Sequence, residues 1–185
     1  MSRNNLVVLG LLNEKPCYGY EMKWAIEHRE LNLWAQIKLP SIYKAINTLE
    51  EKGYITGKKE IIGNTPPRTV YKLTESGKAY LRTLVLKYLT TMGCGKNFTL
   101  GCAFMLNIIS LETFLSTLDS QLEQQHKLLE GMNNQKEHIN SEHVPFNWKR
   151  IFYMGKSYHT AYIETLKNLR KDALDPKNAH WFTKE

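Results

Sequence analysis

The sequence predicts a mainly α protein: an N-terminal winged helix-turn-helix of three helices and a two-stranded β wing, followed by an all-α C-terminal region with a long heptad helix. Two observations support this prediction. Three short helical patterns precede two β-rich segments, an order typical of winged helix domains. Farther along, apolar residues recur at alternating steps of four and three over residues 111–139, as in a helix that packs against a partner helix.

The three N-terminal helices are placed by their apolar positions and by the residues that end helices. The first covers residues 6–12 and ends at the turn before Pro16, and the second runs from about Tyr18 to Glu30. The third begins at Pro40, because a first helical turn tolerates a missing N–H. It ends at Gly53, where a helix commonly closes in a left-handed conformation.

The wing and the C-terminal region follow from the same kind of evidence. Residues 54–62 and 68–73 are rich in β-branched and aromatic residues and flank a polar tip, as in a hairpin. Thr74 is expected to cap a fourth helix. A glycine-containing linker at 93–97 then divides residues 1–92 from residues 93–185, which hold a short helix, the heptad helix and a final helix at about 148–173.

Composition excludes several classes of function. No apolar run approaches the roughly 18 residues needed to cross a bilayer, and the chain shows no export signal. Three cysteines without a CxxC pair argue against a disulfide framework or a thiolate zinc site and favour the reducing cytoplasm. His138, Glu142 and His143 have ligand-like side chains, but no helix face fixes them together. Catalytic motifs are missing, so we expect no enzyme activity, metal or cofactor.

Positive charge is concentrated in the N-terminal half of the chain. The formal net charge is +7, of which residues 1–90 contribute +6 and residues 91–185 only +1. A basic winged helix points to double-stranded DNA as the partner, because cationic side chains bind phosphates. The sequence therefore predicts DNA binding by residues 1–92.

The candidate DNA contacts lie on the third helix and on the wing. In winged helix proteins the third helix enters the major groove and the hairpin lies along the backbone. Lys44 is the leading candidate, since it lies opposite the apolar stripe of its helix. The simpler alternatives are a solvated helix face and lysines that protect a strand edge. The expected contacts are Lys38, Ser41, Tyr43, Lys44, Asn47, Lys58, Lys59, Asn64 and Arg68.

Four motifs occur in order: Tyr18-Gly-Tyr-Glu21, Pro40-Ser-Ile-Tyr43, Leu49-Glu-Glu-Lys-Gly-Tyr54 and Val70-Tyr-Lys-Leu-Thr-Glu-Ser-Gly77. Together they resemble the successive motifs of PadR-type transcriptional regulators over residues 5–90, and the rest of the chain is similar in layout to the dimerisation region of that family's longer members. The resemblance implies a homodimeric repressor on an inverted-repeat operator, released by a small, often aromatic or phenolic, molecule.

Mapped onto this chain, the resemblance assigns DNA reading to Tyr43 and the basic wing contact to Arg68. Many members carry proline directly after that tyrosine, whereas this chain carries Lys44, so a different operator preference is expected. Two other functions remain as alternatives. One is a winged helix module that binds protein instead of DNA, and the other is an enzyme of unrecognised type.

The C-terminal helices supply the candidate dimer and effector residues. The heptad seam is expected to join two copies, or alternatively to pack on the final helix of its own chain. The seam runs to Ile139, and only Gln125 and Lys136 in it are polar. The expected dimer contacts are Leu111, Leu115, Leu118, Leu122, Leu129 and Met132. Aromatic residues of the final helix are expected to line an effector pocket, or alternatively to be packing residues. They are Trp148, Phe152, Tyr158 and Tyr162.

Overall fold

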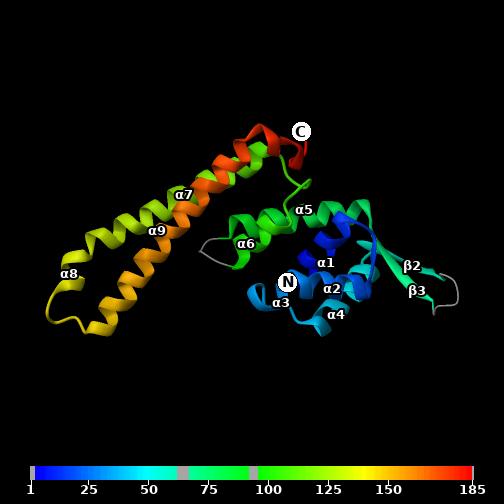
Figure 1. Cartoon of the computed structure of the whole chain (residues 1–185), viewed down its shortest axis with the longest axis horizontal. Coiled ribbons are helices and arrows are strands. Elements are labelled where there is room, and N and C mark those ends of the chain that lie inside the picture. The colour runs from blue at the N-terminus through cyan, green and yellow to red at the C-terminus, as the bar shows by residue number, and fades with distance from the viewer. Residues whose placement is uncertain (1–2, 62–66, 92–95, 185) are drawn as a thin grey trace. The chain divides into compact units, whose positions relative to one another are not determined.

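The computed structural model describes residues 3–61, 67–91 and 96–184, and it confirms a mainly helical fold with one small sheet (Figure 1). The contacts divide the chain into two compact units. The first unit comprises Met1–Thr91 and Gly95–Ile108, and the second comprises Met92–Cys94 and Ile109–Glu185. The segments 62–66 and 92–95, which include Asn64 and most of the expected linker, lie outside the described residues.

The first unit extends beyond the boundary expected at residue 92, because helix α6 (Lys96–Ala103) belongs to it. Gly101 of α6 lies so close to helix α5 (Glu75–Thr90) that an added methyl group would be 3.0 Å from the backbone nitrogen of Leu89. Just beyond α6, the ring of Phe104 packs directly on Gly10. Close packing on two glycines therefore holds residues 96–108 against the N-terminal helices.

Helix α1 (Arg3–Glu14) is the centre of the first unit, and every residue from Leu6 to Leu12 is buried. It packs against α5 and against helix α4 (Leu39–Glu51), the predicted third helix. Helix α2 (Gly19–His28) was also predicted. The short helix α3 (Leu31–Trp34) lies between the predicted second and third helices, where the sequence predicts no helix. The Trp34 indole donates a hydrogen bond of 2.9 Å to the Arg29 carbonyl and helps to close this turn.

The sheet contains one strand more than predicted. Strands β2 (Ile55–Glu60) and β3 (Arg68–Leu73) form the expected antiparallel hairpin, which we call the wing. A two-residue strand β1 (Cys17–Tyr18) pairs with β3, so the order is β1-β3-β2. The sequence shows only a turn there, because two residues are too short for an alternating pattern to be detected.

The ends of α4 and α5 follow the predicted residues. Gly53 has a φ of +70°, and its N–H bonds to the Glu50 carbonyl while the Tyr54 N–H bonds to the Leu49 carbonyl. This is the hydrogen-bond pattern of a glycine-terminated helix. The Thr74 hydroxyl accepts a hydrogen bond of 3.0 Å from the Gly77 N–H and caps α5. Both ends fix where the wing begins and stops.

The second unit is built on two long helices that lie side by side, α7 (Leu111–Asn134) and α9 (Phe146–Leu174) (Figure 1). The short helices α8 (Lys136–Asn140) and η1 (Pro176–Trp181) follow α7 and α9. The long helix ends earlier than predicted, with Gln135 as its C-terminal cap. The residues of α7 that are buried are Phe114, Thr117, Leu118, Gln121 and Gln125.

This buried stripe differs from the predicted heptad seam, of which it contains only Leu118 and Gln125. The other apolar seam residues are half-buried, and Lys136 is exposed. Polar side chains occupy the buried stripe because they find partners there: the Nδ1 atom of His159 lies 2.6 Å from the Oε1 atom of Gln125. The Thr117 hydroxyl likewise donates to the Thr113 carbonyl. A prediction based only on the apolar residues of α7 therefore identifies the face next to the one that is buried.

Candidate nucleic-acid interface

Helix α4 separates a buried face from an exposed polar face. Its inner residues Ile42, Ala45, Ile46 and Leu49 are at most 6% exposed. On the opposite side, Tyr43, Lys44 and Asn47 are exposed, Ser41 is half-buried, and Lys38 is exposed at the N-terminal cap. The expected side chains of α4 therefore lie on one accessible surface, where they can donate hydrogen bonds to phosphates or base edges.

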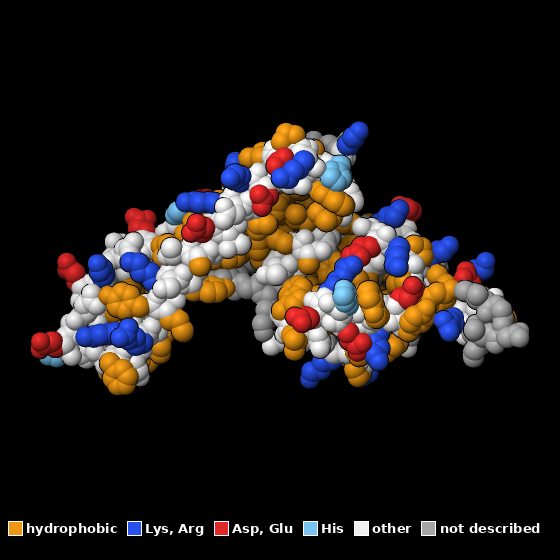
Figure 2. Space-filling view, in the orientation of Figure 1, with side chains coloured by type: hydrophobic (Ala, Val, Ile, Leu, Met, Phe, Trp, Pro, Cys, Tyr) orange, Lys and Arg blue, Asp and Glu red, His pale blue; other side chains and the backbone are white. Residues whose placement is uncertain are grey.

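The wing presents further cations. Lys58, Lys59 and Arg68 are exposed, and Figure 2 shows Lys and Arg side chains around this hairpin. Lys58 lies opposite Val70 and Lys59 opposite Thr69, so the two lysines point to opposite faces of the strand pair. Only one of these lysines can therefore share a face with Arg68.

Glu50 ties the wing to α4. Its Oε1 atom accepts a hydrogen bond of 3.0 Å from the Gly57 N–H, an edge-strand donor of β2. A methyl group at Gly57 would lie 2.6 Å from that same oxygen, so glycine permits the approach. Partial burial and the Glu50 carboxylate raise the pKa of Tyr71. Glu50 therefore connects two parts of the candidate surface, although its charge alone disfavours DNA.

Two tyrosines at the junction of β1 and α2, Tyr18 and Tyr20, lie beside this surface. The guanidinium carbon of Arg68 lies 5.2 Å from the centre of the Tyr20 ring, within the range of a cation–π interaction. Tyr20 stacks on Tyr18 at 5.6 Å between ring centres and is 53% exposed. An added methyl group at Gly19 would lie 3.5 Å from the Tyr43 ring. The Tyr18-Gly-Tyr motif thus adjoins both α4 and the wing.

The hydroxyl of Tyr18 is kept protonated. Partial burial is the main cause of its raised pKa, and the carboxylate of Glu60 is the next. Arg68 acts in the opposite direction. A neutral phenol is a hydrogen-bond donor, as a phosphate contact requires. The local sequence does not distinguish phosphate contact by Tyr18 from core packing. The charges that act on Tyr18, those of Glu60 and Arg68, belong to the wing, which is distant in the sequence.

The candidate effector residues of the second unit lie along α9. Trp148 is 60% exposed and Tyr158 is 45% exposed, whereas Phe152 and Tyr162 are half-buried. Tyr158 and Tyr162 stack, with ring centres 6.4 Å apart. Figure 2 shows hydrophobic side chains at the surface of this unit, near the end where α8 and α9 meet. The four residues thus share one helix without forming a single buried cluster.

The family comparison agrees with the architecture of the first unit. The model of the transcriptional regulator PadR-like family matches residues 8–83, which span α1 to α5. A protein of Lysinibacillus sphaericus described as uncharacterized is 35% identical over 82 residues, which is 44% of this chain and 74% of the relative. The chain belongs to the PadR-like family of transcriptional regulators.

The negative transcriptional regulator PadR of Bacillus subtilis is similar to this PadR-like protein over a longer stretch. It is 22% identical over 161 residues, covering 87% of this chain and 88% of the relative. The crystal structure of Bacillus subtilis PadR in complex with operator DNA is 21% identical, covers 91% of this chain and 98% of its own, and has a TM-score of 0.41. The winged helix arrangement of the first unit is the part of this PadR-like protein that the family model matches.

In the described part of the chain, no helix has the length and apolar character that crossing a membrane requires. No three His, Cys, Asp or Glu side chains in residues 3–61, 67–91 and 96–184 gather where they could hold a metal ion. The residues weighed as possible metal ligands are therefore not brought into such a group.

Proposed function

We propose that this PadR-like protein is a homodimeric repressor that binds an inverted-repeat operator in the cytoplasm and is released by a small effector, without enzymatic activity. One observation supports the proposal most directly. The Glu50–Gly57 hydrogen bond joins α4 to the basic wing, and the Tyr20–Arg68 contact joins the wing to α2. A surface prearranged in this way loses little entropy when it binds DNA.

The DNA contacts divide into two kinds. Tyr43, Lys44 and Asn47, with Ser41 beside them, are placed to enter the major groove and to distinguish base pairs. The exposed cations Lys38, Lys58, Lys59 and Arg68 are placed to bind phosphates, which adds affinity but little sequence information. Asn64, which lies outside the described residues, remains a proposed contact.

The second unit supplies the proposed dimer interface. Leu118 is fully buried against its own chain and is therefore removed from the expected dimer contacts. Leu111, Leu115, Leu122, Leu129 and Met132 keep part of their surface exposed. On α9, Ile151, Met154 and Tyr158 are 45–68% exposed at helical spacing. We call these three residues the α9 apolar stripe, and such a stripe is typical of a helix that binds a partner.

The effector is the least constrained part of the proposal. Trp148, Phe152, Tyr158 and Tyr162 give α9 a series of aromatic rings that can stack on a flat molecule. Because Tyr158 also belongs to the α9 apolar stripe, an effector bound there would compete with the dimer contact.

Selection of DNA by the full-length protein tests the central proposal. We expect a random duplex library to yield an inverted repeat whose half-sites lie about 10 to 10.5 base pairs apart, or a multiple of this spacing. Lys44→Ala should lose or change the preference at defined bases. Lys167→Ala, an exposed lysine of α9, is the matched control and should select the same sequence. Failure to enrich any sequence would reject operator recognition.

Sedimentation analysis tests the dimer separately. The wild-type protein should sediment as a dimer at micromolar concentration, and Ile151→Glu should shift it toward the monomer by placing a charge on the α9 apolar stripe. Ser157→Glu adds the same charge at an exposed polar position of α9 and should leave the dimer intact. A monomeric wild type, or equal effects of the two changes, would contradict this interface.

A further inference from the structure

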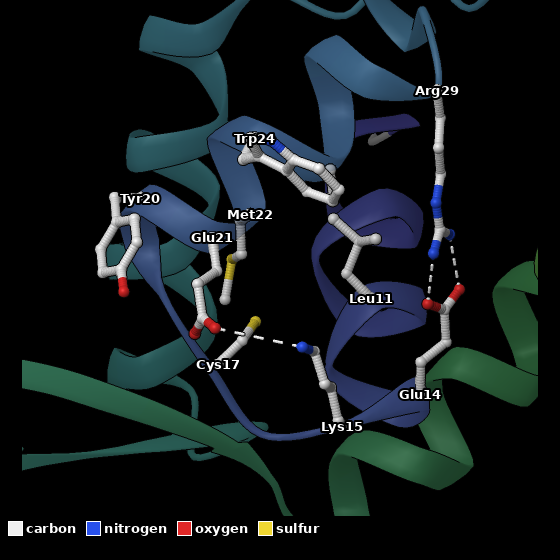
Figure 3. A pocket seen from close by; sticks show the side chains of 10 residues that line it. Leu11, Glu14, Lys15, Cys17, Tyr20, Glu21, Met22, Trp24 and Arg29 are labelled. Carbon is white, nitrogen blue, oxygen red and sulfur yellow. Dashed lines mark hydrogen bonds and ion pairs between the residues drawn. The ribbon is translucent and has the colours of Figure 1, made fainter.

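We propose that the first unit contains a binding site of its own for a small anion with a flat apolar body, in a cavity between the end of α1, strand β1 and helix α2 (Figure 3). The cavity has a volume of about 430 Å³. This is within the usual range of small-molecule sites. Its described lining residues all belong to the first unit, and none of them is an α9 aromatic residue.

The inner walls of the cavity are apolar. Leu11, Cys17 and Met22 are 4%, 5% and 0% exposed. Burial, followed by the charge of Glu21, raises the pKa of the Cys17 thiol to about 11, so this wall carries no charge at neutral pH. Trp24 is 62% exposed and stacks on His28 along one side, with 4.6 Å between ring centres. An indole at the cavity wall favours a flat apolar ligand.

The charged residues of the cavity indicate the sign of the ligand. Arg29 and Glu14 neutralise each other through two hydrogen bonds of 2.7 and 2.6 Å. Glu21 accepts a hydrogen bond of 2.8 Å from the Tyr18 N–H and so closes the first turn of α2. Lys15 reaches toward Glu21, but its Nζ atom stays 4.0 Å from the carboxylate (Figure 3).

Lys15 is therefore the cation of this cavity that can still gain a strong hydrogen bond, among the lining residues that the structure describes. A carboxylate placed beside it would make a charge-assisted bond, which is about twice as strong as a neutral one. A ligand cation would instead have to displace Arg29 from Glu14 or disturb the cap that Glu21 provides. The geometry thus favours an anion.

The site also borders the DNA-binding surface, a consequence that rests on the proposed function. Glu21, which Lys15 faces inside the cavity, holds the first turn of α2. The adjacent Tyr20 supports Arg68, and Gly19 adjoins Tyr43. A ligand that draws Lys15 away from Glu21 changes the restraint on this turn, and through Tyr20 it changes the position of Arg68. Occupation of the cavity should therefore weaken operator binding.

Fluorine NMR of the full-length protein carrying 5-fluorotryptophan tests the site without DNA. Trp24→Phe identifies the Trp24 resonance among those of the four tryptophans. Millimolar 2-naphthoate should shift this resonance, while the neutral 2-naphthamide and the cationic 2-naphthylmethylamine should bind about tenfold more weakly or not at all. Lys15→Met should lower naphthoate affinity by a similar factor. Lys23→Met removes a cation of α2 outside the cavity lining and should not.

The outcomes distinguish anion binding in the cavity from the effect of that binding on DNA affinity. An unshifted Trp24 resonance, equal binding of naphthoate and naphthamide, or preference for the amine overturns the anion site. If the circular dichroism spectrum shows that Lys15→Met does not fold, this variant is not interpreted. The relative affinities of the wild-type protein for the three ligands then test the anion site. In the DNA arm, naphthoate should weaken binding to the selected duplex in the wild type but not in Lys15→Met. Unchanged wild-type binding overturns the coupling, whereas a protein that binds no duplex rejects the proposed function and leaves the NMR result valid.

Discussion

The contact between Tyr20 and Arg68 should contribute to DNA binding by holding the wing arginine in place. We consider Tyr20→Ala, which removes the ring, and Tyr20→Phe, which keeps it. Since Tyr20 is half exposed and Arg68 is exposed, water weakens their attraction. At a separation of 5.2 Å an exposed cation–π pair is worth about 0.5 to 1 kcal/mol. The expected coupling in operator binding is therefore about two- to fivefold in Kd.

A double-mutant cycle isolates this coupling from other effects of each change. Fluorescence anisotropy with the selected duplex would give Kd for the wild type, Tyr20→Ala, Arg68→Ala and the double variant. Tyr20→Ala should weaken binding when Arg68 is present and have a smaller effect when it is absent. Tyr20→Phe should behave as the wild type. A coupling energy of zero, or equal losses in the two Tyr20 variants, would refute the positioning role.

The remaining predictions concern other parts of the first unit. Lys44→Ala should cost about 1 to 3 kcal/mol in binding to the selected duplex and change base preference, as measured by competition with single-base variants. Gly53→Ala should lower the free energy of unfolding by about 1 kcal/mol through its φ of +70°, and Gly77→Ala should lower it more in urea titrations, because the added methyl group collides with the Tyr54 carbonyl. With its pKa raised to about 11 from 9.0, Cys17 should react with iodoacetamide about a hundredfold more slowly at pH 8 than an exposed thiol, and mass spectrometry showing equal rates would contradict this.

The sequence predicts the helices of the first unit well because their signals are local. Pro40 marks the start of α4 because the first helical turn tolerates its missing N–H. Gly53 ends α4 and Thr74 starts α5 through hydrogen bonds that form within a few residues. Strand β1 has no such signal, since it exists only by pairing with β3, more than fifty residues later. For the same reason the Tyr20–Arg68 and Glu50–Gly57 contacts could not be predicted from the sequence, because their partners lie on different elements.

The second unit shows a different limit. The apolar repeat from Leu111 predicts a helix correctly but selects a face that is only half-buried. The stripe that is buried contains Gln121 and Gln125, and the hydrogen bond between Gln125 and His159 explains how a polar side chain can occupy it. No single-sequence pattern reveals that partner on α9. The apolar side chains left outside this stripe are the ones available for another copy.

Dimerisation should contribute more to operator affinity than any single groove contact. Non-specific binding by phosphate contacts reaches a Kd of about 10⁻⁴ to 10⁻⁶ M at physiological salt, and specific sites are typically bound about 10³ to 10⁷ times more tightly. One copy reads few bases, each worth about 1 to 3 kcal/mol. A linked second copy doubles these contacts and binds at high effective concentration. Ile151→Glu should therefore lower operator affinity more than Lys44→Ala while leaving the base preference of each half-site unchanged. An anisotropy titration in which Lys44→Ala is the more damaging change would contradict this ranking.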